Sequence, residues 1–257
     1  MHLTPELLLK ARLRLLKMHY ESGVGHIGGK LSCLEILMVL YHEVLEPNDI
    51  FILSKGHSAG SLYITLWSLG LLTDDDLRTF HMDGTRLSGH PPFQGIPAIP
   101  FATGSLGHGL SLAAGLALAK KLKGLRGRLF CLTSDGEWNE GSNWEALIFT
   151  RQQNLNVTTI VDLNGLQGFG RTRDIANLEP LADKFKAFGV RTSEVDGHDL
   201  EAITAAVGED IDGPKVVIAK TQKGHGVSFM EDQFEWHYLP LSREAYRLAV
   251  EQVSANA

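Results

Sequence analysis

The sequence predicts an α/β fold in which a mainly parallel central sheet is covered by helices on both faces. Short apolar or β-branched runs recur along the chain, and helical patterns of about ten residues or more lie between them. Parallel strands need such long crossover connections, whereas antiparallel strands can be joined by tight turns. The predicted strands are residues 49–53, 128–133, 157–163, 190–195 and 215–219.

The first predicted helix begins after Thr4, a residue type that caps helices, and has Pro5 in its first turn. Apolar side chains at Leu8, Ala11 and Leu15 then form a stripe at helical spacing. The helix is expected to end before the glycine-rich stretch that follows it. Further helices are predicted at about 32–44, 59–69, 110–120, 144–153, 180–188 and 200–207.

The composition is that of an ordinary globular protein. Of 257 residues, 44% are hydrophobic and 21% are charged, which is enough to bury a core without disulfide bonds. The sequence has no repeat and no long linker. We therefore expect a single domain over residues 1–257, with 87–102 as a long structured loop and 231–257 as a peripheral C-terminal tail.

Charge and cysteine content restrict the possible partners and the compartment. Lys and Arg number 24 against 30 Asp and Glu, and no basic block is present, so a nucleic-acid partner is not expected. The amino-terminal segment mixes apolar and basic residues and lacks an apolar run of membrane length. Cys33 and Cys131 lie in apolar runs, as buried free thiols do. These features favour a cytoplasmic protein that does not bind membranes.

Three glycines near the amino terminus imitate a dinucleotide-binding motif. Gly23, Gly25 and Gly28 have the G-x-G-x-x-G spacing, but a predicted helix precedes them where the motif requires a strand. This excludes a Rossmann-type nucleotide site. The stretch is either a glycine loop that joins two helices or a loop that faces a ligand, and His26 within it favours the second interpretation.

Polar residues follow the predicted strands, where open parallel sheets bind their ligands. Asp135 follows one strand and Asn164 the next, with room between them for one helix and one return strand. The two side chains are therefore expected to meet at the carboxyl edge of the sheet. A carboxylate and an amide oxygen suit Mg²⁺ or Ca²⁺ together with a phosphorylated ligand. Taken alone, Asp135-Gly136 would indicate only a turn with an exposed cap.

An ordered set of motifs favours the metal interpretation. The motifs are GHIGG at 25–29, LSKGH at 53–57, GHP at 89–91, TGSLGHG at 103–109, SDGE at 134–137 followed by Asn164, EGSNWEA at 140–146, VDGH at 195–198, KTQKG at 220–224 and ED at 231–232 followed by WH at 236–237. The set extends over nearly the whole chain and resembles the cofactor-diphosphate half of transketolase, a thiamine diphosphate enzyme. Ser134 replaces the usual first glycine of the family's metal motif, while Ile27 and His108 stand where many members have proline and glutamine.

The resemblance implies a cofactor site of thiamine diphosphate with Mg²⁺ or Ca²⁺. It places the metal on Asp135, Asn164 and the main chain of Leu166, all of which offer oxygen. It places the diphosphate on His57 and Gly136, and the aminopyrimidine on the backbone at Gly104 and Leu106. Ser105 and Glu137 belong to the same implied cofactor-binding set.

The resemblance also implies catalytic and substrate-facing residues. His26, His90 and His237 match histidines that line the sugar channel, where imidazoles can pass protons near neutral pH. Lys55 and Lys223 lie beside motif glycines. Each can face a phosphate or a substrate oxygen, and an ordinary solvated lysine is an equally good interpretation.

A complete transketolase of this type would be more than twice as long and would carry its own pyrimidine domain. We therefore expect an N-terminal subunit whose partner, a C-terminal pyrimidine-domain subunit, is another chain. The implied reaction transfers a two-carbon ketol unit between a ketose and an aldose, through a thiamine diphosphate adduct. The expected substrates are small sugars, in the first place sugar phosphates, and the expected assembly is a heterotetramer in which this chain also forms a homodimer.

Two alternatives stay open from the sequence. The first is half of another thiamine diphosphate enzyme, one that forms acyloins or decarboxylates 2-oxoacids. The second is a non-catalytic remnant that retains the fold. Retention of Asp135, Asn164 and the histidines together argues against a remnant.

Overall fold

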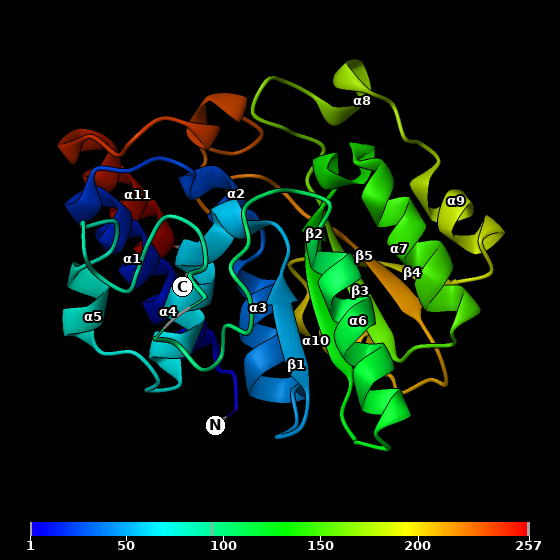
Figure 1. The fold of residues 1–257 in the computed structure, drawn as a ribbon. Coiled ribbons are helices and arrows are strands. Elements are labelled where there is room, and N and C mark those ends of the chain that lie inside the picture. The colour runs from blue at the N-terminus through cyan, green and yellow to red at the C-terminus, as the bar shows by residue number, and fades with distance from the viewer. Residues whose placement is uncertain (1, 94, 256–257) are drawn as a thin grey trace.

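The computed structural model describes residues 2–93 and 95–255, and its centre is a five-stranded sheet in the order β1-β2-β3-β5-β4 (Figure 1). Every pair of neighbouring strands is parallel. The predicted fold class is confirmed, and the observed strand bounds lie within one residue of the predicted ones. They are β1 Ile50–Leu53, β2 Leu129–Ser134, β3 Val157–Leu163, β4 Arg191–Asp196 and β5 Lys215–Lys220.

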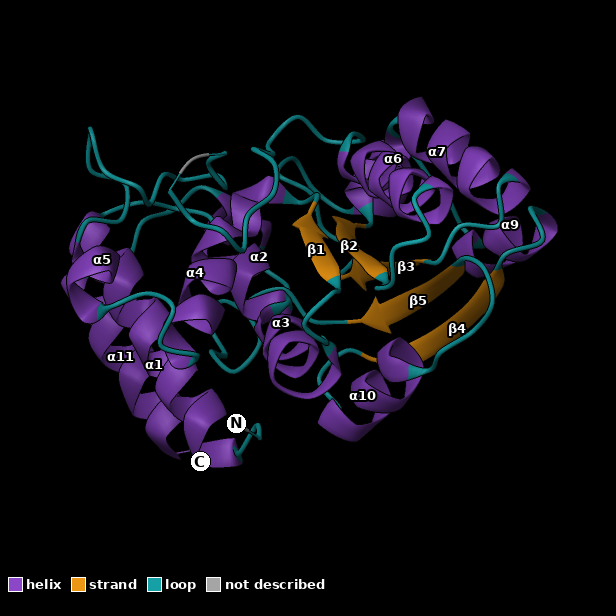
Figure 2. Cartoon of the chain, turned by 60° about the horizontal axis from the view of Figure 1, so that its bottom comes forward, coloured by secondary structure: helices purple, strands orange, loops and turns teal. Residues whose placement is uncertain are grey.

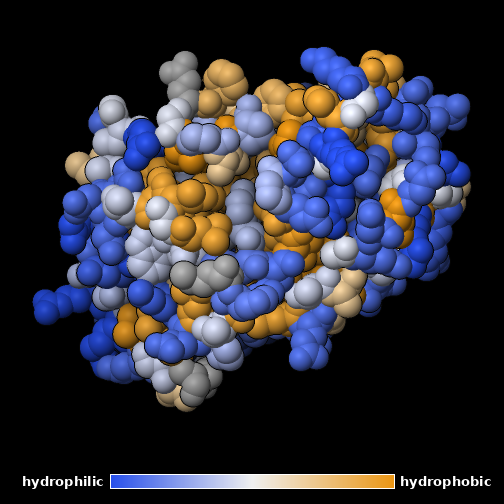
Figure 3. Space-filling model, turned by 90° about the horizontal axis from the view of Figure 1, so that it is seen from below, coloured by the Kyte–Doolittle hydropathy of each residue, from blue (hydrophilic) through white to orange (hydrophobic). Residues whose placement is uncertain are grey.

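Helices cover both faces of the sheet, as Figure 2 shows. One face is covered by α6 (Gly109–Leu122), α7 (Gly141–Gln152) and α9 (Leu181–Ala187), and the other by α3 (Leu34–Val39) and α10 (Leu200–Gly208). Successive side chains of a strand point to opposite faces, so the strands contribute to two separate hydrophobic clusters. On the underside of the molecule, hydrophobic residues gather in patches in the middle and at the upper edge of the view, between hydrophilic residues (Figure 3).

The first helix, α1 (Pro5–Ser22), follows the sequence prediction closely. The Thr4 side chain accepts a hydrogen bond from the backbone N–H of Leu7 at 3.2 Å and so caps the helix. Gly23 ends it with a φ of 65°, a left-handed conformation that glycine adopts without strain. Together with α4 (Ala59–Ser68), this helix extends the core beyond β1.

The second predicted helix is wrong in its start and its continuity. The chain forms α2 (Ile27–Ser32), then α3, then a π-helical turn over Leu40–Val44. Gly28 therefore lies in a helix and not in a glycine loop. Glycine is a poor helix former, so the local signal for α2 is weak. Its use here is steric, because a Cβ at Gly28 would lie 3.2 Å from the Cβ of Trp236.

Several short elements had no prediction. They are α5 (Asp74–Arg78), α8 (Thr172–Ile175) and 3₁₀ turns at Gly56–Ser58, Gly136–Asn139 and Phe234–His237. Within the described part of 87–102, the chain forms no helix or strand, as expected of a structured loop. Residue 94 of that loop lies outside the described residues.

The carboxyl-terminal segment ends in α11 (Arg243–Ala255), which packs along α1. Ala249 and Val253 are buried, and the rings of Tyr20 and Tyr246 stack at 4.5 Å between the two helices. Residues 256–257 of the predicted tail lie outside the described residues. Across the described ranges, no helix is both long enough and apolar enough to cross a membrane.

Candidate functional site

A pocket of about 550 Å³ opens at the carboxyl edge of the sheet. Its walls come from the ends of β2 and β3, from the loops after α1 and β1, and from the segment after β5. Most residues that the sequence assigned to cofactor, metal or substrate line this one pocket. They are His26, His57, His90, Gly104, Leu106, Asp135, Gly136, Asn164, Leu166, Lys223 and His237.

Asp135 lies directly after β2, at the start of the 3₁₀ turn, and is only 2% exposed. Its Oδ2 accepts hydrogen bonds from the backbone N–H of Gly165 at 3.0 Å and from the Thr172 hydroxyl at 2.7 Å. Burial raises the pKa of Asp135 to about 6, although the Thr172 bond acts against this shift. The chain thus holds a carboxylate that gains stability if a cation comes beside it.

Asn164 follows β3, the strand that pairs with β2 in parallel, and therefore reaches the same edge as Asp135. Its Oδ1 accepts a hydrogen bond from the backbone N–H of Leu166 at 3.0 Å. On its other side, Nδ2 donates to the hydroxyl of Ser32 at 3.4 Å. Asp135, Asn164 and Leu166 thus line the same pocket, and each carries an oxygen of the hard type that divalent cations prefer.

Histidine rings from separate loops also line the pocket. The backbone N–H of His26 donates to the carbonyl of His237 at 3.0 Å, and the two ring centroids are 4.7 Å apart. The His57 ring lies 5.5 Å from the His237 ring. His26 itself has a φ of 67°, an uncommon conformation for a residue with a side chain.

Burial keeps these imidazoles neutral. It lowers the pKa of His26 to about 4 and that of His237 to about 3, and it lowers the pKa of His57 well below the usual value. It also lowers the pKa of His90. Nearby lysine charges act in the same direction as burial. At neutral pH the rings therefore carry one proton each and can both donate and accept.

Lys223 lines the pocket beside the histidines. Its Nζ donates to the main-chain oxygen of Gln167 at 3.1 Å and lies 3.3 Å from Nδ1 of His237. Burial and the neighbouring charge of Lys55 lower the pKa of Lys223 to about 8. The ammonium is still the main form at pH 7, and it faces a pocket suited to an anion.

The sequence suggested that Lys55 faces either a ligand or the solvent. In the structure Lys55 is buried and is not among the residues that line the pocket. It is fully buried and pairs with Asp162, while its Nζ also donates to the main-chain oxygen of Gly29 at 3.1 Å. The physical reason is the carboxylate of Asp162, which sits in the buried strand β3 and needs a counter-charge. The substrate role predicted for Lys55 is accordingly not retained.

Ser105 and Glu137 also lie off the pocket wall. Ser105 is exposed, whereas Glu137 is fully buried. The Glu137 carboxylate accepts from the Ser54 hydroxyl, from Gly107 N–H at 2.9 Å and from Ser134 N–H at 3.2 Å. Glu137 therefore fastens the loop after residue 103 to two strand ends.

Two glycines leave room in the pocket where a side chain would intrude. A Cβ at Gly104 would lie 3.1 Å from the His90 ring, and a Cβ at Gly136 would lie 2.8 Å from the Gln167 side chain. Gly104 has a φ of 157°, which residues with a side chain rarely adopt, so both its backbone conformation and the space favour glycine. Backbone N–H groups at such positions can approach a ligand closely.

Sequence reasoning missed several residues that shape this pocket. Gln167 and Tyr238 line it, and Thr172 donates to Asp135. Their only sequence signal is position, because they follow Asn164 or His237 within a few residues. The shape of these loops depends on tertiary contacts, which residue type alone does not indicate.

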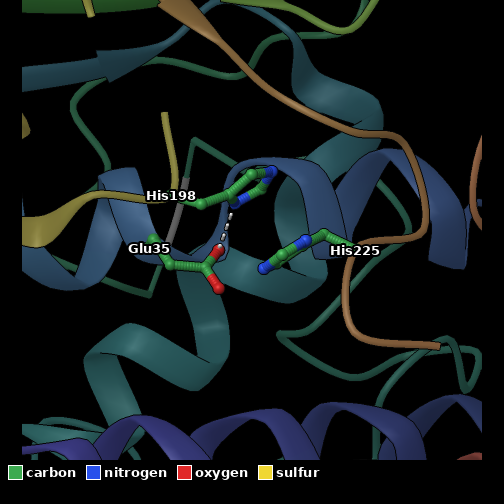
Figure 4. A group of neighbouring side chains, drawn as sticks. All are labelled: Glu35, His198 and His225. Carbon is green, nitrogen blue, oxygen red and sulfur yellow. Dashed lines mark ion pairs between the residues drawn. The ribbon is translucent and has the colours of Figure 1, made fainter. Parts of the chain in front are cut away.

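A second polar cluster lies outside the pocket, where Glu35, His198 and His225 point toward one another (Figure 4). Glu35 pairs with Arg12 and faces Nδ1 of His198 at 3.5 Å, while Nε2 of His198 accepts from the backbone N–H of Gln222 at 2.9 Å. That bond puts the proton of a neutral His198 ring on Nδ1, toward Glu35. His198 thus contacts the segment after β5 through Gln222. Among the described residues, Nδ1 of His198, Nδ1 of His225 and Oε2 of Glu35 are buried without a hydrogen-bond partner.

The chain matches the family described as "Transketolase, thiamine diphosphate binding domain" over residues 8–256. It is 39% identical to an apulose-4-phosphate transketolase subunit of Actinobacillus succinogenes, over 95% of this chain and 93% of that protein. It is 36% identical to the 6-deoxy-6-sulfo-D-fructose transketolase subunit SqwG of a Clostridium species, over 91% and 90% of the two chains.

Solved structures give the same result. The transketolase of Campylobacter jejuni is similar with a TM-score of 0.88 at 28% identity, over 98% of this chain and 43% of that one. The transketolase of Leishmania mexicana shares the fold with a TM-score of 0.86 at 24% identity, over 100% and 46%. This chain thus spans less than half the length of either solved transketolase. The chain belongs to the transketolase thiamine diphosphate-binding domain family.

Proposed function

We propose that this chain is the N-terminal subunit of a two-component transketolase that transfers a two-carbon ketol unit between a ketose and an aldose. The observation that carries the proposal is the single pocket that joins the Asp135–Asn164 pair to a set of neutral histidines. Relatives of nearly the same length are named as transketolase subunits, which supports a partner chain with the pyrimidine domain. We further propose a cytoplasmic heterotetramer of two such chains and two partners.

The fit of the pocket to its cofactor rests on the donor set. Asp135, Asn164 and the carbonyl of Leu166 would hold Mg²⁺, or Ca²⁺, because all three offer hard oxygen. His57 and Gly136 would hold the diphosphate, and the backbone at Gly104 and Leu106 the aminopyrimidine. Thiamine diphosphate, when bound, supplies the nucleophilic carbon and the electron sink for breaking a carbon–carbon bond beside a carbonyl.

The histidines would handle protons at the oxygens of the sugar. A neutral imidazole can donate to a substrate carbonyl or accept from a hydroxyl, and the low pKa values of His26 and His237 keep both rings neutral. The ammonium of Lys223 faces Nδ1 of His237, so the ring proton of His237 would sit on Nε2. His90 would complete this proton-handling group.

The substrates we propose are small sugars that carry an anionic group, in the first place sugar phosphates. One relative is named for apulose 4-phosphate and another for 6-deoxy-6-sulfo-D-fructose, which together support an anionic sugar without fixing which one. Lys223 is the pocket cation best placed to meet an anionic oxygen.

The test is reconstitution of the full chain with a pyrimidine-domain partner, thiamine diphosphate and Mg²⁺, assayed on a panel of ketose phosphates, sulfonated ketoses and pyruvate. We expect ketol transfer from a ketose that requires both chains, with His237→Gln reducing kcat by about 10²-fold or more. The matched control is His42→Gln, since His42 bonds Ser68 away from the pocket. Turnover of pyruvate alone, or equal activity of both variants, would contradict the proposal.

A further inference from the structure

We propose that Ser32 is a positioning residue that turns the Asn164 side-chain oxygen toward the metal, and that the buried Lys55–Asp162 pair fixes Ser32 in that task. This inference rests on the proposed function, because it concerns the orientation of a proposed metal ligand. It assigns a role to polar groups that lie behind the pocket wall and contact no substrate.

The contacts form one continuous chain from the protein interior to the pocket. Ser32 is the last residue of α2 and is fully buried. Its hydroxyl lies 2.7 Å from Oδ2 of Asp162 and 2.9 Å from the main-chain oxygen of Gly29. On the pocket side, Nδ2 of Asn164 donates to the same hydroxyl at 3.4 Å.

The direction of the Ser32 hydroxyl follows from its single proton. The charged Asp162 oxygen is both the nearer and the stronger acceptor, so the proton points into the protein. The oxygen lone pairs are then left to accept from Asn164. Ser32 therefore favours a nitrogen, and disfavours an oxygen, on the side of Asn164 that faces it.

The opposite side of the amide is fixed independently. The backbone N–H of Leu166 donates to Oδ1 of Asn164 at 3.0 Å. A flipped amide would place its NH₂ against this N–H group and its oxygen against the Ser32 lone pairs, losing both hydrogen bonds. The two contacts thus select one amide orientation, with the oxygen toward Leu166, whose main chain is itself one of the proposed metal ligands.

Asp162 is itself held from three directions. Lys55 and the Thr221 hydroxyl contact its two oxygens, and Ser32 shares the oxygen that Lys55 contacts. Asp162 and Lys55 are both fully buried. Burial acts to lower the pKa of Lys55, but the charge and hydrogen bond of Asp162, together with smaller contributions from other neighbours, raise that pKa overall. A buried ion pair whose polar atoms are hydrogen-bonded holds the Ser32 hydroxyl in a fixed position. In this proposal Lys55 therefore has a positioning role and does not bind substrate.

The decisive comparison is Ser32→Ala against Ser58→Ala. Both hydroxyls are buried and both lie within hydrogen-bonding distance of the Gly29 carbonyl, Ser58 at 3.1 Å, but Ser32 alone of the two contacts Asn164. The full chain is titrated with Mn²⁺ in the presence of thiamine diphosphate, and free Mn²⁺ is followed by electron paramagnetic resonance. We expect Ser32→Ala to weaken Mn²⁺ binding by about tenfold or more, and Ser58→Ala to change it less than about twofold.

Equal Mn²⁺ affinities of the Ser32→Ala and Ser58→Ala chains would overturn the inference. If Ser32→Ala does not fold, Ser32→Cys takes its place with the same threshold, because a thiol fills the site but is a weak acceptor. Asp135→Ala separates this inference from the proposed function. If Asp135→Ala binds Mn²⁺ as tightly as the wild type does, the proposed metal site fails. If Asp135→Ala abolishes binding while Ser32→Ala leaves it unchanged, only the role of Ser32 fails.

Discussion

The two sides of the pocket are built in different ways. The oxygen wall, which we define as Asp135, Asn164 and Leu166, comes from the ends of two adjacent parallel strands. The histidine wall, defined as His26, His57, His90 and His237, comes from loops that lie far apart in the sequence. The oxygen wall is therefore positioned by the sheet register, whereas the histidine wall depends on the packing of several loops against one another.

Both walls nevertheless respond to burial in the same way. Burial raises the pKa of the Asp135 carboxyl and lowers the pKa values of the histidines, so each group is shifted toward its neutral form. The two lysines differ in place and partner: Lys55 lies behind the pocket wall and pairs with the Asp162 carboxylate, whereas Lys223 lines the pocket and contacts the Gln167 carbonyl and the His237 ring. The pocket lining therefore sets two groups that are charged at pH 7, the Lys223 ammonium and the Asp135 carboxylate, beside histidines that are neutral.

The largest expected effect concerns the buried Lys55–Asp162 pair, which lies behind the oxygen wall. Lys55→Met should destabilise the chain by about 3–5 kcal/mol, because it leaves the Asp162 carboxylate buried without its counter-charge. Lys223→Met is the matched control, since Lys223 is also buried but contacts the Gln167 carbonyl and the His237 ring in place of a carboxylate. Urea unfolding measures both. Equal losses of stability in Lys55→Met and Lys223→Met would contradict the claim that Lys55 is needed as the counter-charge of Asp162. The double variant Lys55→Met/Asp162→Asn should recover much of the stability lost in Lys55→Met.

A second prediction separates the stability of the oxygen wall from its proposed use. The pKa of Asp135 rises from an ordinary value of 3.8 to about 6 on folding, so ionisation opposes folding. The stabilising effect of the protonated form is present below about pH 4 and is lost as the pH rises to about 6. Without ligands, Asp135→Asn should therefore be more stable than the wild type at pH 7, by about 2–3 kcal/mol, and no more stable at pH 4.

Urea unfolding of the ligand-free chain at these two pH values measures the effect. Asparagine keeps an oxygen that can accept from Gly165 and Thr172, so the comparison isolates the charge. If Asp135→Asn is less stable than the wild type at pH 7 but not at pH 4, the ionised carboxylate stabilises the ligand-free chain. Asp135 then needs no cation to offset its burial.

The histidine wall should show the smaller effect, because solvent reaches its half-buried rings. The folded pKa values of His26 and His237 lie below the usual 6.5, so the unfolded chain binds more protons as the pH falls below about 6.5. Their contribution to stability is present above that pH and declines as the pH approaches 4. NMR titration of the ring protons, assigned with His26→Gln and His237→Gln, should give midpoints near 4 and 3. Midpoints at about 6 or above would contradict the lowering of these two pKa values by burial.

The sequence predicted the sheet and the oxygen wall for the same reason. Adjacent parallel strands end at one edge, so Asp135 and Asn164 could be placed together from their positions after two predicted strands. The histidine wall was assigned through family resemblance, because no local pattern states which loops meet. The short helix α2 was missed because its glycines are poor helix formers.

Lys55 shows the remaining limit of sequence reasoning. A lysine after a strand looks like a surface or ligand-binding group, and only the buried carboxylate of Asp162, on a neighbouring segment, changes that interpretation. The same holds for Ser32, whose hydroxyl gains its role from Asn164, far away in the sequence. Pairings of this kind are set by tertiary packing and not by local propensity.

The most direct test of the oxygen wall is a crystal structure of the full chain with thiamine diphosphate and Mn²⁺, using anomalous scattering to locate the ion. We predict one strong peak bound by Asp135, the Asn164 amide oxygen and the Leu166 carbonyl, at metal–oxygen distances of about 2.0–2.3 Å. A bound cofactor whose only peak lies elsewhere, for example beside Glu35, would contradict the assignment.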